Sequence, residues 1–188
     1  LTDIKKKNLS DVYHYIYMNP SCSKQDIATA LSVSLPTVSQ HLTTLESEQL
    51  IEKCGRLSSS VGRRANAYQI ISDAKIAIGL EILPHTTHIL SINLYGKMIA
   101  KETLPVSFEA SAAYFSKLKK AVKNFCQINH HKAESILGIG LGVQGLISPD
   151  GSELTYGKIL DCTGMSIDVF SDAFHVPCKF VHDAECAC

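Results

Sequence analysis

The first seventy residues alternate apolar and polar positions with the period of an α-helix. Apolar side chains recur one helical turn apart at Leu9, Val12, Tyr13, Ile16 and Tyr17. This spacing predicts an amphipathic helix over residues 9–18 that ends at Asn19-Pro20. A second helix is expected after Ser23, which has Asp26 three residues later as an acidic variant of the capping box.

A third helix is predicted after the short turn that ends at Ser34. Ser34 is its expected N-cap, and Pro36 lies in the first turn, where a missing N–H costs nothing. Its expected buried residues are Val38, Leu42 and Leu45. Its expected outward residues, all able to hydrogen-bond, are Thr37, Gln40, His41 and Thr44. Two short helices, a tight turn and a polar-faced third helix are typical of a helix-turn-helix.

The stretch "LIEKCGRLSSSVGRRANAYQI" then predicts a strand, a basic loop and a second strand. The loop that begins at Arg56 has the composition of a flexible linker. Its position after a helix-turn-helix, followed by a strand at 68–71 that can pair back, favours a hairpin wing instead. The predicted unit is therefore a winged helix over residues 1–72, and the linker is expected in the short "SDA" that follows Ile71.

From residue 74 the pattern changes to strands. "AKIAIGLEIL", "THILSINLYG" and "MIAKETLPV" predict three consecutive strands, followed by a helix with Phe115, Leu118, Val122 and Phe125 on its buried face. "SILGIGLGV" predicts a fully buried strand, "ISPDG" a turn, 168–174 a short helix and "CKFVHDA" a last strand. The predicted fold class is α+β with two domains. The winged helix is followed by an actin-like, ribonuclease-H-like α/β half-domain over 73–188.

Charge is balanced overall but not along the chain. Residues 1–72 carry eight basic and six acidic side chains, and residues 73–188 carry ten and twelve. The segment 52–70 holds four basic residues against one acidic residue, which is compatible with a polyanionic partner. No apolar run is long enough to span a bilayer, and the seven scattered cysteines fit reduced thiols, so we expect a cytoplasmic protein with no membrane partner.

These features predict contact with double-stranded DNA. The third helix has the size of a major-groove reader, with Gln40 suited to adenine edges. Hydroxyls and guanidinium groups of the wing suit phosphates or a narrow minor groove. The candidate DNA-binding residues are Ser34, Thr37, Gln40, His41, Thr44, Arg56, Ser59, Arg63 and Arg64. A protein-binding winged helix that never touches DNA is the alternative at this point.

The second part resembles the ROK family of sugar kinases and sugar-responsive repressors, of the xylose-repressor or N-acetylglucosamine-repressor type. Four stretches carry the resemblance in order: "IGLEI" with "LYGK", then "GIGLGVQGLISPDG", "DCTGMS" and "VHDAECA". With the preceding winged helix and its "GRR", the resemblance covers nearly the whole chain. It implies that this chain corresponds to the N-terminal portion of such a protein, and we expect a fragment.

Kinases of the family resemble D-I-G-G-T-K at the end of the first strand, where glycines let the backbone approach the ATP phosphates. This chain has Glu81-Ile82-Leu83-Pro84-His85 followed by Thr86, and Pro84 also removes a backbone donor. We therefore expect no phosphotransfer and no catalytic residue.

The resemblance implies a sugar site at Gly145, Gly164, His182 and Asp183. Asp183 matches the general base of the kinases, and His182 replaces its usual Asn neighbour. Asp183 also suits a strand-end helix cap, and both glycines also suit simple turns. No cofactor or metal site is expected within this chain, because Cys186 and Cys188 do not match the zinc motif of the family, which lies further along.

The function that follows is a DNA-binding transcriptional regulator of carbohydrate-metabolism genes, most consistent with a repressor. The resemblance implies a homodimer or higher homo-oligomer on a near-palindromic operator, with a sugar or sugar phosphate as effector. The alternative is an active ROK-type sugar kinase with an accessory winged-helix domain.

Overall fold

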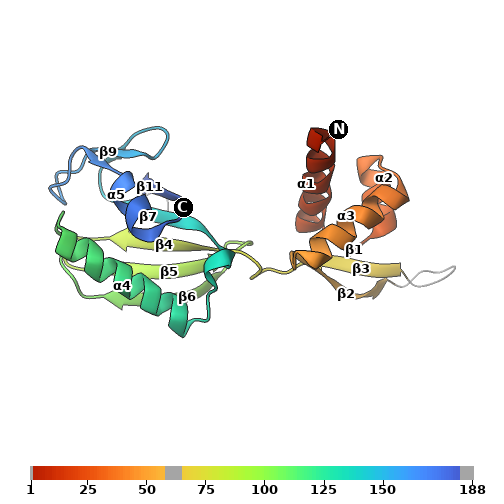
Figure 1. Ribbon diagram of the computed structural model, residues 1–188, viewed down its shortest axis with the longest axis horizontal. Coiled ribbons are helices and arrows are strands. Elements are labelled where there is room, and N and C mark those ends of the chain that lie inside the picture. Colours follow the sequence, from red (N-terminus) through yellow and green to blue (C-terminus); the bar gives the residue numbers. More distant parts are fainter. Residues whose placement is uncertain (1, 58–64, 183–188) are drawn as a thin grey trace. The chain divides into compact units, whose positions relative to one another are not determined.

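The chain folds into two compact units, Leu1–Ala74 and Lys75–Cys188, in a computed structural model that describes residues 2–57 and 65–182 (Figure 1). The described residues of the first unit form three helices and three strands. They are α1 (Thr2–Met18), β1 (Cys22–Ser23), α2 (Lys24–Leu31), α3 (Leu35–Ser47), β2 (Ile51–Leu57) and β3 (Ala65–Ile70). This is the winged helix-turn-helix that the sequence predicts, and α1 starts at Thr2 rather than at residue 9.

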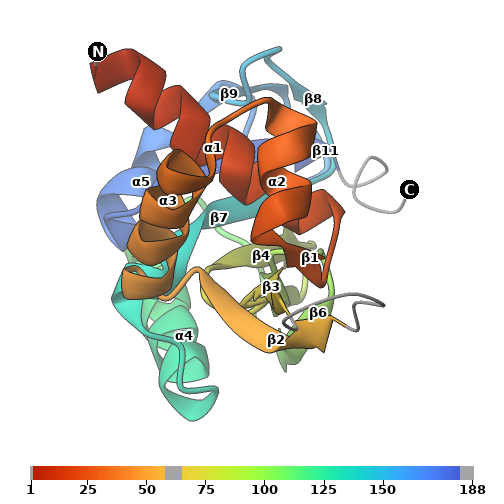
Figure 2. The same ribbon diagram turned by 90° about the vertical axis from the view of Figure 1, so that its right-hand side faces the viewer.

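Helices α2 and α3 follow each other along the chain (Figure 2), and a side-chain cap sets where each begins. Ser23 accepts from the backbone N–H of Asp26 at 3.2 Å, and its own N–H donates to the Asp26 carboxylate at 2.8 Å. This reciprocal pair is the predicted capping box. Ser34 caps α3, with Pro36 in its first turn, as predicted. Since a cap satisfies N–H groups that have no partner inside the helix, each helix starts at a defined residue.

The wing strands belong to a three-stranded antiparallel sheet in the order β1-β3-β2. Lys53 lies opposite Tyr68 in the β2–β3 pair, and Cys22 of β1 lies on the other side of the same tyrosine. The two-residue β1 was not predicted, because a strand of this length has no periodicity of its own. It forms because β3 offers it an edge to pair with.

The second unit is built on a five-stranded sheet in the order β11-β7-β4-β5-β6. Its strands are β4 (Ile76–Ile82), β5 (Thr87–Asn93), β6 (Met98–Leu104), β7 (Ile136–Val143) and β11 (Cys178–His182). The pairs β4–β5 and β5–β6 are antiparallel, whereas β7 runs parallel to both β4 and β11. Parallel neighbours need crossovers, and α4 (Ala112–Ile128) and α5 (Asp168–Phe174) lie on them. This is the predicted actin-like α/β half-domain.

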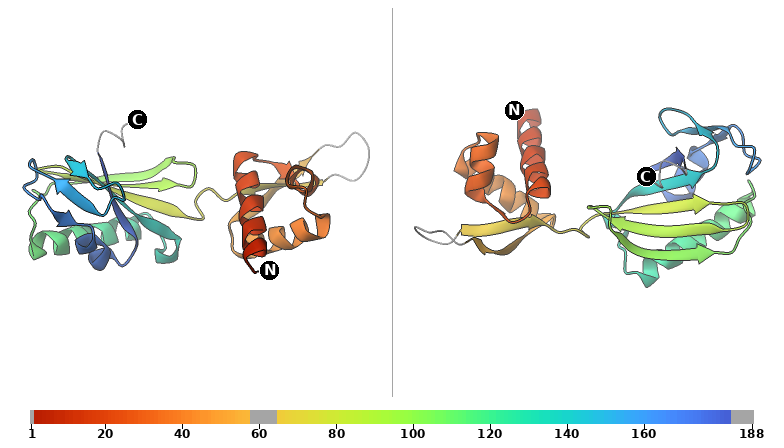
Figure 3. Two further views of the ribbon diagram at one scale, coloured as in Figure 1. Left: turned by 90° about the horizontal axis from the view of Figure 1, so that it is seen from above. Right: turned by 180° about the vertical axis from the view of Figure 1, so that it is seen from behind.

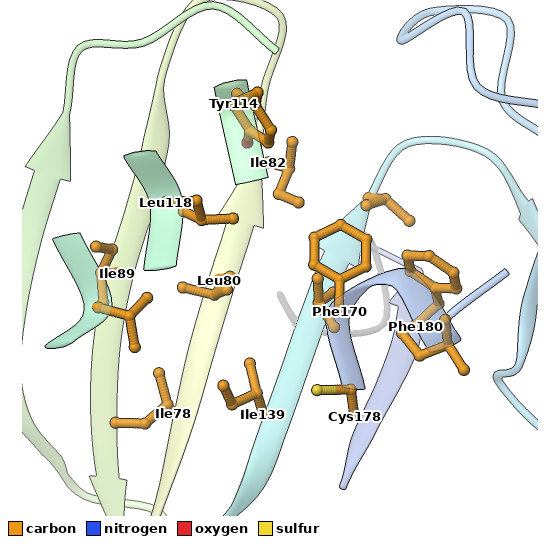
Figure 4. Close-up of a cluster of buried hydrophobic side chains, with 14 of the residues drawn as sticks. Ile78, Leu80, Ile82, Ile89, Tyr114, Leu118, Ile139, Phe170, Cys178 and Phe180 are labelled. Atoms are coloured by element: carbon orange, nitrogen blue, oxygen red, sulfur yellow. The ribbon is translucent and has the colours of Figure 1, made fainter. Parts of the chain in front are cut away.

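Both helices cover the same face of this sheet (Figure 3). Alternate residues of β4 are buried beneath them, and α5 contributes Phe170, which is 1% exposed (Figure 4). The buried residues of α4 are Tyr114, Leu118, Val122 and Phe125. The sequence placed Phe115 in this set. It is half-buried and packs edge-on against Phe170, while the Tyr114 hydroxyl is buried 3.1 Å from that of Thr87.

A small sheet that was not predicted follows β7. It consists of β8 (Leu146–Ile147), β9 (Glu153–Tyr156) and β10 (Met165–Ser166), in the order β10-β9-β8. The predicted turn at 147–151 joins β8 to β9, and there the Ser148 hydroxyl donates to the Asp150 carboxylate at 2.7 Å. Hydrogen bonds from Ser148 and Ser152 hold the pKa of the Asp150 carboxyl at about 2. The N–H of Phe180 donates to the Gly151 carbonyl, which joins this turn to β11.

Replacing Leu118 by Ala tests the core of the second unit. Leu118 is 0% exposed, so we expect a loss of about 2–5 kcal/mol in the free energy of unfolding of this unit. Urea denaturation followed by circular dichroism measures it. Ile128→Ala is the matched control on the same helix: Ile128 is 63% exposed, and its truncation should cost less than about 0.5 kcal/mol. Equal effects of the two substitutions would contradict this packing.

Candidate nucleic-acid interface

The solvent-facing side of α3 is a surface of uncharged side chains, most of them polar. The four buried positions of the helix are Val38, His41, Leu42 and Leu45. The exposed positions along the opposite side are Pro36, Gln40, Thr43 and Ser47, which together we name the α3 face. Glu46 is the charged side chain of α3, and its partner is Lys53 of β2, with Oε1 and Nζ 3.0 Å apart. This hydrogen bond raises the pKa of the Lys53 ammonium.

His41 corrects the sequence prediction, because it is buried rather than outward. Its side chain is 8% exposed, and Nε2 has no hydrogen-bond partner among the residues that the structure describes. Each residue advances about 100° around a helix, so His41 lies only about 60° from Val38, within the buried arc. The same geometry centres the exposed arc on Gln40 and Thr43. The sequence prediction relied on the polarity of histidine and did not consider the position of His41 around the helix axis.

Ser34 and Thr37 lie at the start of α3 and bond to each other. Their hydroxyl oxygens are 2.8 Å apart, and the Thr37 N–H donates to Ser34 Oγ at 3.4 Å. Ser34 is exposed and Thr37 half-buried. The same pair that caps the helix therefore places two hydroxyl groups beside its first turn.

The threonines further along α3 use their hydroxyl protons within the helix. Thr43 donates to the Ser39 carbonyl at 3.0 Å, and Thr44 donates to the Gln40 carbonyl at 3.1 Å. Their oxygens can still accept a hydrogen bond from a partner. Thr44 is half-buried and Thr43 is exposed, so Thr43, which was not predicted, is better placed for contact.

The described part of the wing carries one of the predicted arginines. Arg56 is exposed on β2, opposite Asn66 of β3. The side chains of Glu52 and Gln69 bond across the same two strands at 2.7 Å. Ser59, Arg63 and Arg64 lie outside the described residues, so their part in the interface stays a prediction.

The predicted sugar-site residues belong to the second unit. A Cβ added at Gly145 would collide with the Tyr156 carbonyl oxygen, so close packing requires a glycine there. Gly164 has φ +80°, and its N–H donates to the Leu154 carbonyl at 2.8 Å. Both glycines thus have structural reasons of their own. His182 is half-buried at the end of β11 and lines a hollow of about 350 Å³ together with Ser148 and Phe180. Asp183 lies outside the described residues.

The segment that the family resemblance places at the phosphate loop of the kinases is a tight hairpin between β4 and β5. The Leu83 N–H donates to the Thr86 carbonyl at 2.9 Å, so this donor is used within the turn. Pro84 has no N–H, and its carbonyl accepts from the N–H of Phe108 at 3.0 Å. His85 is exposed, with Nδ1 3.4 Å from the Ser107 hydroxyl. Two of the backbone groups that a phosphate would need are therefore missing or used.

The described ranges 2–57 and 65–182 contain no candidate metal site and no candidate membrane-spanning helix. No group of three or more His, Cys, Asp or Glu side chains there could hold a metal ion. None of the described helices is long and apolar enough to cross a bilayer. Cys186 and Cys188 lie outside these ranges, and the zinc site implied by the family resemblance stays a prediction.

Comparison with known proteins supports the first unit as a DNA-binding domain and identifies the fold of the whole. Residues 7–52 match a family model described as winged helix-turn-helix DNA-binding. A ROK-family transcriptional regulator, a homologue of the Escherichia coli Mlc protein, superposes over 96% of this chain and 46% of its own, with TM-score 0.71 and 15% identity. The chain has the fold of a ROK-family transcriptional regulator. A search of curated protein sequences gives no significant match.

The ROK fold is shared with enzymes. A ROK-family glucokinase from Streptomyces griseus, solved in complex with glucose and AMPPNP, matches 60% of this chain and 34% of its own, with TM-score 0.50 and 16% identity. The chain thus spans about half the length of the regulator and about a third of that of the kinase. At these identities the likeness concerns the fold, and the chemistry must be argued from the residues of this chain.

Replacing His41 by Leu tests its burial. Removing a buried nitrogen without a partner should leave the free energy of unfolding of the first unit unchanged or raise it by up to about 1–3 kcal/mol. Thermal denaturation measures the effect, and His85→Leu, at an exposed position in the second unit, is the control. A marked loss of stability in His41→Leu would show that Nε2 has a partner after all.

Proposed function

We propose that this protein is a sequence-specific DNA-binding transcriptional regulator. The observation that carries the proposal is the α3 face, an exposed row of neutral side chains on the third helix of a winged helix-turn-helix. An α-helix fits the major groove of B-DNA, where the amide of Gln40 can pair with the N6 and N7 edge of adenine. Thr43 can accept a hydrogen bond or place its methyl group against that of thymine.

The wing supplies the sequence-independent part of this interface. Arg56 is exposed on β2, and the sequence places Ser59, Arg63 and Arg64 in the loop that follows. Guanidinium groups pair with phosphates or enter a narrow minor groove, which fixes orientation more than sequence. Ser34 and Thr37 add hydroxyl groups at the start of α3, where a phosphate can also be bound.

A winged helix that binds only protein is the competing reading of the first unit. The two differ in their response to salt, because each phosphate contact releases counterions and makes binding weaken steeply as salt rises. A protein interface of neutral side chains such as Gln40 and Thr43 has no comparable dependence. The cluster of basic residues at 52–70 favours DNA.

The second unit is proposed as an effector sensor, and the whole as a repressor of carbohydrate-metabolism genes. Support comes from the fold shared with a ROK-family regulator and a ROK-family glucokinase. A sugar or sugar phosphate held by His182 and Asp183 would bind one arrangement of the protein better than another and so change operator affinity. Gly145 and Gly164 stay in the proposed site as backbone positions, with the packing roles described above.

Sugar phosphorylation is the alternative function, favoured by the likeness to a kinase. The hairpin at 83–86 argues against it, since the Leu83 N–H is bonded to Thr86 and Pro84 has none to offer. A triphosphate would meet a closed turn instead of free amides. We therefore assign binding without catalysis to this unit.

A homodimer or higher homo-oligomer in the cytoplasm completes the proposal. One copy of α3 contacts only a few base pairs, whereas two copies related by a two-fold axis contact both halves of a near-palindromic operator. A DNA-binding regulator must also share a compartment with DNA. The scattered free cysteines, of which Cys54 and Cys126 are half-buried, suit a reducing environment.

The double substitution Arg63→Ala and Arg64→Ala tests the DNA interface. If both side chains contact phosphates, the slope of log affinity against log salt should become shallower by about 1.8, and binding should weaken. Fluorescence anisotropy with a duplex selected from a random-sequence library measures this at several salt concentrations. Lys119→Ala with Lys120→Ala on α4 is the matched control, because both side chains are exposed in the second unit. An unchanged salt slope in the double variant would show that the segment with Arg63 and Arg64 is a linker that does not contact DNA.

The enzymatic alternative is tested with ATP, Mg²⁺ and a panel of hexoses, pentoses and amino sugars. We expect no sugar-dependent ADP release in a coupled assay, because the 83–86 hairpin lacks the amides that would hold the phosphates. The Streptomyces griseus glucokinase serves as the positive control. Robust turnover by this chain would overturn the assignment of a non-enzymatic sensor.

A further inference from the structure

Lys24 is the first residue of α2, and its side chain crosses to α3. Its Nζ donates to the Ser39 hydroxyl at 2.9 Å, and the Ser39 hydroxyl donates in turn to the Leu35 carbonyl at 2.8 Å. The pair is partly buried, and Ser39 directly precedes Gln40 of the α3 face. A continuous chain of donors thus runs from α2 to the first turn of α3, and neighbouring hydrogen bonds in such a chain strengthen one another.

Helix stability does not explain a lysine at this position. The first turn of a helix carries a partial positive charge, so a cation there is unfavourable, and cations stabilise the opposite end. Asp26 is the acidic residue of this turn, but its carboxylate is already bonded by the N–H and hydroxyl of Ser23. These bonds, that from the N–H first, lower the pKa of the Asp26 carboxyl and keep it charged. Lys24 therefore suits a role toward a partner better than a role in the helix.

Lys24 is also the sole lysine or arginine among residues 24–47, which comprise α2, the turn and α3. The exposed residues of α3 near it are neutral, and Glu46 is paired with Lys53. A lysine ammonium has three donors, and Ser39 uses one of them. The others can reach an anion beside the α3 face.

We infer that Lys24 is a positioning residue for α3: it bonds a DNA backbone phosphate on one side and Ser39 on the other. The inference rests on the proposed DNA-binding function and deepens it. The phosphate contact places α2 against the DNA backbone, and the bond to Ser39 carries that position to Gln40, one residue further along α3. Phosphate contacts fix register, and base contacts then read sequence. Lys24 connects the two.

Three variants separate the charge of Lys24 from its link to α3. Lys24→Ala should weaken binding several-fold and make the salt slope shallower by about 0.9, the value of one phosphate contact. Lys24→Arg keeps the charge and should keep the slope. Ser39→Ala keeps the charge but removes the link, so the slope should hold while discrimination between the selected duplex and single-base variants falls. Anisotropy titrations of the 188-residue chain measure the salt slope and the discrimination between duplexes.

The controls distinguish this inference from its rivals. Lys120→Ala in the second unit removes one exposed charge and should leave the salt slope and the discrimination between duplexes unchanged. A lower melting temperature of Lys24→Ala with no rescue by Lys24→Arg would make Lys24 a structural residue and overturn the inference. A salt slope of Lys24→Ala equal to that of the unsubstituted chain would also overturn the inference. Full discrimination by Ser39→Ala would overturn the link to α3. If the unmodified chain binds no duplex in a salt-dependent way, the proposed function fails, and this inference with it.

Discussion

The burial of one stripe of α3 determines what the first unit can present to a partner. Val38, Leu42 and Leu45 lie on one side of the helix and are almost completely buried. Because the helix is rigid and has 3.6 residues per turn, burying these three fixes the direction of every other side chain on it. Gln40 and Thr43 face solvent for that reason alone. A slip of one residue in this stripe would present a different surface.

The helix caps make this register unambiguous, and they were visible in the sequence. The spacing of Ser23 and Asp26 predicts the start of α2, and Ser34 with Pro36 predicts the start of α3. Such signals are local, since a cap bonds within three residues of itself. The bounds of α5 were also predicted, although its N-cap residue, Ile167, makes no side-chain cap hydrogen bond. Elements that depend on distant partners were missed: β1 forms only because β3 offers an edge, and the short strands β8–β10 pair with one another.

On the first unit the sequence prediction placed His41 wrongly and missed the contact between Lys24 and Ser39, for two different reasons. For His41 the necessary information was present, because its angular distance from Val38 places it in the buried arc. The burial of a helical residue depends on both its hydrophobicity and its position around the helix axis, and for His41 the position determines the burial. For Lys24 the information was absent, since the bond to Ser39 depends on how α2 crosses α3. Tyr114 and Phe115 show a smaller error of the first kind, with two adjacent aromatic residues competing for one buried position.

The second unit combines a fold shared with a ROK-family glucokinase with a closed hairpin between β4 and β5. The core of this unit depends on the order of the five strands and on the buried face of β4. None of the residues of the 83–86 hairpin is buried in that core. There a turn closed by Leu83 and Thr86 stands where free amides would be needed. Binding that does not lead to turnover suits a sensor, because an effector can shift an equilibrium only while it stays intact and bound.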